Sequence, residues 1–385
     1  MQENHSWNRD KTETVFSSNG VRLSAYEWMF VGIVVLIVIS FGPGLWGRIE
    51  KFEPEPDYRI PYQLSYDYWF YEHYSRRAGG RNDIFVIGDS VVWGHYVPED
   101  ETLSAYLNKI TGSERFVNLG VDGIHPVALF GLLKYYGSGI SNSRVILHFN
   151  PLWLSSEKHD LQTEKEYRFN HPRLVPQFYP KIPCYKASFA KRISTVIERR
   201  ISFLNWISHL KIMYFESMDL TTWTLEHPYE NPFGALTLKL PVSTDNSRNE
   251  SISWIERRLT QQDFQWVTLD SSLQWEFFRL TVELLQKRGN KVFVLVGPFN
   301  EHILTGRSIE VYRKIKSDIE LWLQKNNIPY YMPQTLPSEL YADASHPLSE
   351  GYAILAKQLF ESPSFKTTIM SFNDFAKTVS FAASN

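Results

Sequence analysis

The chain has 385 residues, of which 43% are hydrophobic and 21% are charged, and its formal net charge is −2 from 40 Lys and Arg against 42 Asp and Glu. This composition is typical of a chain that buries a core, and it excludes wholesale disorder. The balanced charge argues against a protein that mainly binds the phosphates of nucleic acid, so we expect no nucleic acid partner. Cys184 is the single cysteine, so no intrachain disulfide and no cysteine-ligated metal site can form.

A strongly apolar segment lies near the N-terminus. Residues 28–47 carry no charged side chain, and a helix of that length reaches about 30 Å, enough to cross the core of a bilayer. The alternatives are a buried helix or a cleaved signal peptide, but no small-residue cleavage pattern follows the segment. We therefore predict a single-pass transmembrane anchor over residues 28–47, after an N-terminal tail over residues 1–27. The flanking charges leave its orientation open.

The sequence after the anchor predicts one large α/β domain over residues 81–360. A linker over residues 48–80 joins it to the anchor, and a tail over residues 361–385 follows it. Short apolar runs predict buried strands at residues 84–87, 116–119, 144–149, 291–296 and 328–332. Helical spacing occurs at residues 102–110, 126–136, 308–326 and 351–360. This alternation predicts a parallel sheet covered on both faces, with functional residues beyond the carboxyl ends of its strands.

A long insertion, about residues 155–262, separates the two halves of this domain, and we expect it to be largely helical. Within it, residues 181–211 carry seven Lys and Arg and a single acid, Glu198. Such a charge pattern is typical of a solvated helix face. The alternative is a surface that faces anionic lipid or an acidic envelope polymer.

Residues suited to nucleophilic catalysis lie after the first and last predicted strands. Ser90 follows the first strand and enters a helix, which predicts a hydroxyl at the carboxyl edge of the sheet, beside free helix amides. Asp343 and His346 follow the last strand. A serine nucleophile needs a base, and the base needs an orienting carboxylate, which His346 and Asp343 can supply. Taken singly, an N-cap serine and a chance Asp-x-x-His pattern would explain them equally well.

Two further segments contain candidate oxyanion donors. Gly123 follows the second strand and Asn150 ends the third, and a glycine amide and an asparagine side chain are donors that suit a tetrahedral intermediate. The alternatives are a turn glycine with positive φ and a loop cap before Pro151. Because four such features occur in order, each at a strand end, coincidence explains them poorly.

These segments resemble the SGNH (GDSL-type) serine hydrolase superfamily over about residues 82–151 and 290–360. Residues 88–94 match its Gly-Asp-Ser-x-x-x-Gly block, Gly123 matches the second-block glycine, and residues 343–347 match its Asp-x-x-His-Pro block. In the third block, Gly-x-Asn-Asp, Asn150 is retained, whereas His148 and Pro151 replace the other two residues. The resemblance implies a flavodoxin-like three-layer α/β/α fold around a central parallel sheet.

The resemblance also implies roles and an activity. Ser90 would be the nucleophile, His346 the base and Asp343 its orienter, with Asn150 and the amides of Ser90 and Gly123 as oxyanion donors. Membrane-anchored members of this kind move or remove acyl groups on envelope polymers, often beside a multi-spanning acyltransferase. We therefore expect ester hydrolysis or O-acyl transfer on an acylated glycan or related polymer, without a cofactor, on the extracytoplasmic side of the membrane. The alternatives are a catalytically silent protein that binds an envelope polymer or partner, and a lipase or thioesterase.

A last polar cluster, Asn300, Glu301 and His302, follows the strand at residues 291–296 and could contact substrate or form a capped loop. His95 and His125 lie near the site in sequence, and we interpret them as satisfied loop or core residues. No second His or carboxylate stands at ligand spacing on a shared helix, so no metal site is predicted.

Overall fold

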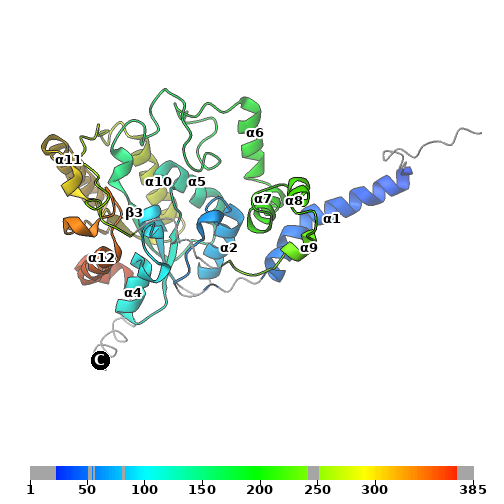
Figure 1. Ribbon diagram of the computed structural model, residues 1–385, viewed down its shortest axis with the longest axis horizontal. Helices are drawn as coiled ribbons and strands as arrows, with labels where there is room; N and C mark the ends of the chain where they lie inside the picture. Colours follow the sequence, from blue (N-terminus) through cyan, green and yellow to red (C-terminus); the bar gives the residue numbers. More distant parts are fainter. Residues whose placement is uncertain (1–22, 51–53, 55–56, 80–82, 242–250, 371–385) are drawn as a thin grey trace, which may run out of the picture. The chain divides into compact units, whose positions relative to one another are not determined.

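The computed structural model describes residues 23–50, 54, 57–79, 83–241 and 251–370 (Figure 1). The chain divides into two units, one ending at Trp46 and the other starting at Gly47. Helix α1 (Ala25–Ile49) contains the predicted span and extends it at both ends. Its side chains are mostly exposed, and it is long and apolar enough to cross a membrane. Most of the predicted N-terminal tail lies outside the described residues.

A five-stranded parallel sheet forms the centre of the second unit, in the order β2-β1-β3-β4-β5. Its strands are β1 (Ile84–Gly88), β2 (Phe116–Gly120), β3 (Arg144–Phe149), β4 (Lys291–Val296) and β5 (Tyr330–Tyr331). The predicted strands are thereby confirmed, although β5 is shorter than residues 328–332. Pro329 and Pro333 flank it, and neither can donate to a strand ladder. The strand order reverses between β1 and β3, where parallel α/β sheets place their sites.

Alternate residues of each strand enter two separate cores, one on each face of the sheet. Phe85, Ile87 and Val145 belong to the larger core, whereas Val86 and Ile146 belong to the smaller one. The larger core is covered by α2 (Tyr68–Gly79), α5 (Pro126–Tyr136), α10 (Leu273–Lys287) and α11 (Gly306–Lys325). The smaller core is covered by α4 (Leu103–Thr111), α12 (Ser349–Glu361) and α13 (Pro363–Ile369) (Figure 1). Helices therefore cover both faces, as predicted.

The domain begins earlier and ends later in the structure than the sequence indicated. The expected linker contains α2, and Tyr58, Ile60 and Phe70 are buried in the larger core. In the expected C-terminal tail, Phe365 and Ile369 of α13 are buried in the smaller core. Residues 371–385 lie outside the described part of the chain.

The prediction of a largely helical insertion is wrong for its first part. Helices α6 (Phe189–Glu198), α7 (Ser202–Tyr214), α8 (Leu220–Glu226) and α9 (Pro232–Ala235) occur in the later part, but residues 155–188 contain no helix or strand. Four prolines between residues 172 and 183 each remove a backbone donor and so prevent regular structure there. This coil is nevertheless packed, since Leu161, Leu174 and Ile182 are buried in the larger core.

A buried charge cluster holds the residue that directly follows α1. His209 of α7 lies between two carboxylates, with Nδ1 2.7 Å from Asp67 Oδ2 and Nε2 3.0 Å from Glu50 Oε1. The hydroxyl of Tyr214 also donates to Glu50. Burial alone would lower the pKa of His209, but the two carboxylates raise that pKa to about 9. His209 is therefore a buried cation at neutral pH.

We expect the stability of the protein to fall at alkaline pH because of this cluster. The folded-state pKa of His209 lies above its unfolded value, so its stabilisation is complete below about pH 6.5 and is lost as the pH rises through about 9. The Tm of the wild type should therefore drop between pH 7 and pH 9.5 more steeply than the Tm of His209→Gln. His227→Gln, a change outside the cluster, should keep the wild-type slope. Parallel slopes for the wild type and His209→Gln would contradict the assignment.

Candidate active site

Ser90 opens a short helix directly after the central strand β1. Helix α3 (Ser90–Trp93) is capped by Asp89, whose side chain accepts the amide of Val91 at 3.0 Å. The amide of Ser90 is the first of the helix and has no acceptor within it, so it is available to a developing anion. The turn from β1 into α3 therefore places both the hydroxyl and one anion donor at the carboxyl edge of the sheet.

The structure brings the predicted triad together. His346 Nε2 lies 2.8 Å from Ser90 Oγ, although the two residues are 256 positions apart in the chain. On its other side, His346 Nδ1 lies 2.9 and 2.8 Å from the two carboxylate oxygens of Asp343. If Nδ1 carries the ring hydrogen and donates it to Asp343, Nε2 is left to accept the proton of Ser90. This is the geometry that a general base requires.

The charges in the triad support one another. Burial alone would raise the pKa of Asp343, but the neighbouring His346 and the amides of Ser345 and His346 hold that pKa well below its usual range. Burial alone would lower the pKa of His346, but the Asp343 carboxylate raises it above its ordinary value. Asp343 is therefore ionised at neutral pH and favours the imidazolium form of His346.

One residue of the predicted substrate cluster, Asn300, contacts the triad loop. Asn300 is fully buried, and its side-chain amide donates to the backbone oxygen of Asp343 at 3.0 Å, so it supports the loop that carries the orienting carboxylate. Glu301 and His302 instead line a pocket whose lining includes no triad residue. Contact of these three residues with substrate stays a prediction.

The candidate oxyanion donors lie in the loops after β2 and β3. Gly123 has a φ of +68°, and a Cβ there would stand 2.3 Å from Asn170 Nδ2, so the turn requires glycine. Asn150 is buried, and its Nδ2 donates to Asp89 Oδ2 at 2.9 Å. Because an amide nitrogen carries two hydrogens, one remains for a tetrahedral intermediate.

Asp89 is a second carboxylate at the site, and it is buried in surroundings that the sequence did not indicate. Besides Asn150, Trp153 donates its Nε1 hydrogen to Asp89 Oδ2 at 2.9 Å, and His148 Nδ1 lies 3.2 Å from Asp89 Oδ1. The His148 ring is buried and has the spacing of an ion pair, but neither of its nitrogens has a hydrogen-bond partner among the described residues. Burial would raise the pKa of Asp89, yet His148 and Asn150 lower it to about 2. Asp89 therefore stays charged and fixes the orientation of Asn150.

A second His–Asp pair borders the triad, and the sequence interpretation missed it. His95 Nδ1 lies 2.6 Å from Asp122 Oδ1, and the ring of His95 lies 5.4 Å from the ring of His346, centroid to centroid. Tyr96 meets the His346 ring edge-on, also at 5.4 Å. The only sequence signal for this pair was its position, since His95 follows the nucleophile helix and Asp122 directly precedes Gly123. His125, in contrast, caps α5 and contacts the backbone oxygen of Asn170, as a satisfied core residue does.

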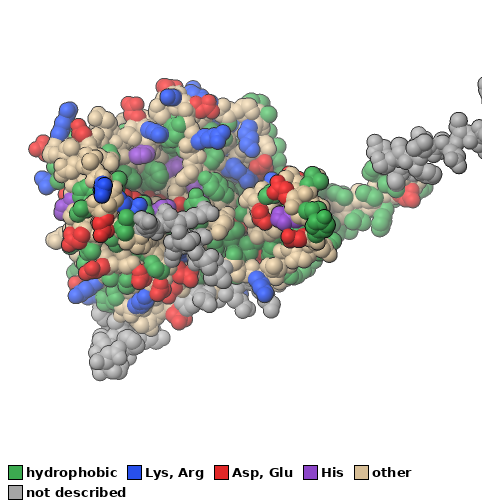
Figure 2. All heavy atoms as spheres, viewed as in Figure 1, with side chains coloured by type: hydrophobic (Ala, Val, Ile, Leu, Met, Phe, Trp, Pro, Cys, Tyr) green, Lys and Arg blue, Asp and Glu red, His purple; other side chains and the backbone are tan. Residues whose placement is uncertain are grey.

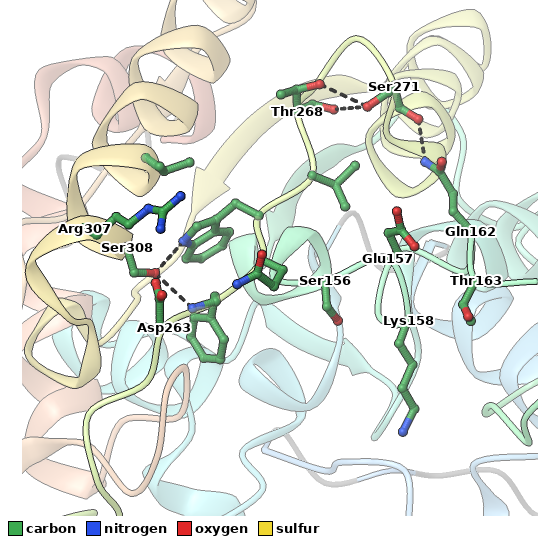
Figure 3. Close-up of a pocket in the computed structure, with 15 residues that line it drawn as sticks. Ser156, Glu157, Lys158, Gln162, Thr163, Asp263, Thr268, Ser271, Arg307 and Ser308 are labelled. Carbon is green, nitrogen blue, oxygen red and sulfur yellow. Dashed lines mark hydrogen bonds between the residues drawn. The ribbon is translucent and has the colours of Figure 1, made fainter. Parts of the chain in front are cut away.

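A cavity of about 860 Å³ lies elsewhere, between the insertion and the start of α11 (Figure 3). Trp266 and Ser308 line it, joined by a 2.8 Å hydrogen bond from the indole nitrogen to the hydroxyl. Its lining includes neither Ser90 nor His346. Within the described residues, no group of three or more His, Cys, Asp and Glu side chains is arranged to hold a metal ion.

We expect Asn150→Ala to slow acylation of Ser90 by an active-site probe by about 10²–10³-fold, the loss typical of one oxyanion donor. Trp153→Phe is the matched control, because it removes a hydrogen bond to the same oxygen of Asp89 but leaves Asn150 in place. This control should slow acylation far less. The rates are measured by stopped-time labelling, and equal losses in the two variants would mean that Asn150 acts only through Asp89.

Comparison with protein-family models finds no match. Comparison with curated proteins finds none either. The SGNH resemblance therefore stays a prediction, and the chemistry is inferred from the geometry of the site.

Proposed function

We propose that the protein is a membrane-anchored serine enzyme of the SGNH type that transfers acyl groups through a Ser90 acyl-enzyme. The observation that carries this proposal is the continuous hydrogen-bonded series from Ser90 through His346 to Asp343. Two features support the fold assignment: the strand order, which matches the flavodoxin-like order, and the location of Ser90 after the central strand. An intact triad also favours an enzyme over a catalytically silent binding protein.

The first half of the reaction forms the acyl-enzyme. Ser90 Oγ attacks the carbonyl carbon of the acyl ester while His346 Nε2 takes the hydroxyl proton. The resulting oxyanion receives hydrogen bonds from Asn150 and from the amides of Ser90 and Gly123. His346 then gives its proton to the leaving alcohol oxygen as the bond between carbonyl carbon and leaving oxygen breaks.

The second half releases the acyl group. An acceptor hydroxyl, from water or from a glycan, attacks the acyl carbon, and His346 takes its proton. Collapse of the intermediate breaks the bond to Ser90 Oγ, which regains a proton from His346. The reaction is ester hydrolysis with water and O-acyl transfer with a glycan hydroxyl.

Anchoring by α1 supports a substrate at the membrane surface, and we propose an acylated envelope polysaccharide or a related polymer. The catalytic domain would lie on the extracytoplasmic side, where such polymers are found, and a multi-spanning acyltransferase would be a suitable partner. The length and apolar composition of α1 support single-pass anchoring.

We expect a fluorophosphonate probe to label the wild-type protein at Ser90, because an activated serine hydroxyl attacks phosphorus as it attacks a carbonyl carbon. Ser90→Ala should abolish labelling, and His346→Ala should reduce it to background. Ser141→Ala, a change at an exposed serine, should label like the wild type. Peptide mapping identifies the labelled residue, and a folded wild type that takes up no label would contradict the proposal.

The pH dependence of labelling should report the raised pKa of His346. Only the neutral imidazole accepts the Ser90 proton, so the labelling rate should rise with pH, with its midpoint above 6.5. Asp343→Asn removes the carboxylate that raises this pKa, so the midpoint should move to lower pH. The plateau rate should also fall, by about 10⁴-fold. Identical midpoints in the two proteins would contradict the role given to Asp343.

A further inference from the structure

An exposed apolar surface lies on α8, on α9 and between them. Leu220, Leu225, Tyr229 and Phe233 are 54, 76, 100 and 82% exposed, and we call these four residues the apolar platform. In the same part of the molecule, Figure 2 shows hydrophobic side chains beside acidic ones. A concentration of large exposed apolar side chains on so short a segment is typical of a surface that contacts another phase or partner.

The platform rests on an ordered base. Trp223 of α8 is buried, stacks on His227 at 4.5 Å and meets Phe215 edge-on at 5.4 Å, ring centroid to ring centroid. Asp219 caps α8 through the amide of Thr222. Because Trp223 already fills the inner face of α8, the exposed Leu220 and Leu225 of the platform lie on a supported helix.

Contacts within the second unit tie this base to the end of the apolar helix. Phe215 is the neighbour of Tyr214, and the Tyr214 hydroxyl donates to Glu50. Glu50 is the first residue after α1, and it is also held by His209 of α7. Four residues lead from Trp46, where the first unit ends, to Glu50, and they span at most about 14 Å. Within the second unit, the base of the platform is therefore connected through Tyr214 to the residue that directly follows α1.

We propose that the apolar platform inserts into the lipid interface of the membrane that α1 crosses. This inference rests on the proposed anchoring by α1, but not on the proposed catalysis. The aromatic rings of Tyr229 and Phe233, together with two leucines, suit the boundary between headgroups and acyl chains.

The charges of the segment specify the kind of lipid contact. Residues 216–239 contain the acids Glu216, Asp219, Glu226 and Glu230 and one base, Lys239. Because the segment is mainly acidic, attraction to anionic lipid cannot hold it on a membrane. Burial of its apolar side chains can hold it there, so zwitterionic lipid suffices, and added salt should have little effect on the contact between the platform and the lipid.

The test uses the full chain in nanodiscs of phosphatidylcholine. Leu225→Cys, Tyr229→Cys and Phe233→Cys each carry an environment-sensitive fluorophore, and phosphatidylcholine with bromine or spin labels distributed along its acyl chains acts as quencher. Cys184 is buried, so the unsubstituted chain gives the labelling blank. Ile37→Cys in α1 is the positive control for anchoring, and Leu321→Cys, at an exposed site on α11, is the negative control.

We expect quenching at residues 225, 229 and 233 to reach at least about half of that at residue 37, because interfacial helices insert about 5–10 Å. Residue 321 should show none, and 0.5 M salt should leave the pattern unchanged. Quenching at residue 37 without quenching at the platform would overturn the inference and would favour a protein partner for this surface. A loss of platform quenching in salt would equally overturn it. Absence of quenching at residue 37 would overturn the anchoring itself, and the fluorophosphonate experiment reports on catalysis separately.

Discussion

The hydrogen bond between Ser90 Oγ and His346 Nε2 joins the loop after the first strand to the loop after the last, and the rest of the domain holds these two atoms 2.8 Å apart. Ser90 is fixed by the turn from β1 into α3. His346 is oriented by Asp343, and Asn300, which follows β4, supports the backbone of Asp343. The loop after β3 orients Asn150 against Asp89. Residues that follow strands distant in sequence thus each support the contact between Ser90 and His346. They can do so because a parallel sheet brings the carboxyl ends of its strands to one edge.

Electrostatics makes this arrangement suitable for transferring a proton. During the proposed reaction His346 becomes an imidazolium, and it does so beside Asp343, with the charge of Asp89 also favouring the cation. Both carboxylates keep low pKa values although the loss of hydration would raise them, because hydrogen bonds and imidazole neighbours compensate for it. In the proposed reaction, the site would therefore stabilise positive charge on the base and negative charge on the substrate oxygen.

Short-range sequence patterns predicted the positions of the strands, of several helices and of the triad residues. Five strands and four helices could be located because apolar runs and helical spacing are short-range signals, and the triad followed from residue types at strand ends. Burial of α2 could not be predicted, since its run of four aromatic residues is followed by charged ones and its apolar partners lie far away in sequence. The insertion contains less helix than predicted, because the prolines between residues 172 and 183 interrupt regular structure before α6. The His95–Asp122 pair could not be predicted, because it depends on the turn geometry of two loops that are separate in sequence.

The packed coil of residues 155–188 has a consequence for how this architecture can change over evolutionary time. Leu161, Leu174 and Ile182 complete the core, so the segment behaves as part of the domain rather than as an appendage. Excising it would leave the sheet's larger core open to water, at a cost of about 1.5–3 kcal/mol for each large apolar side chain uncovered. The segment therefore tolerates point changes at its exposed positions better than shortening or removal as a whole.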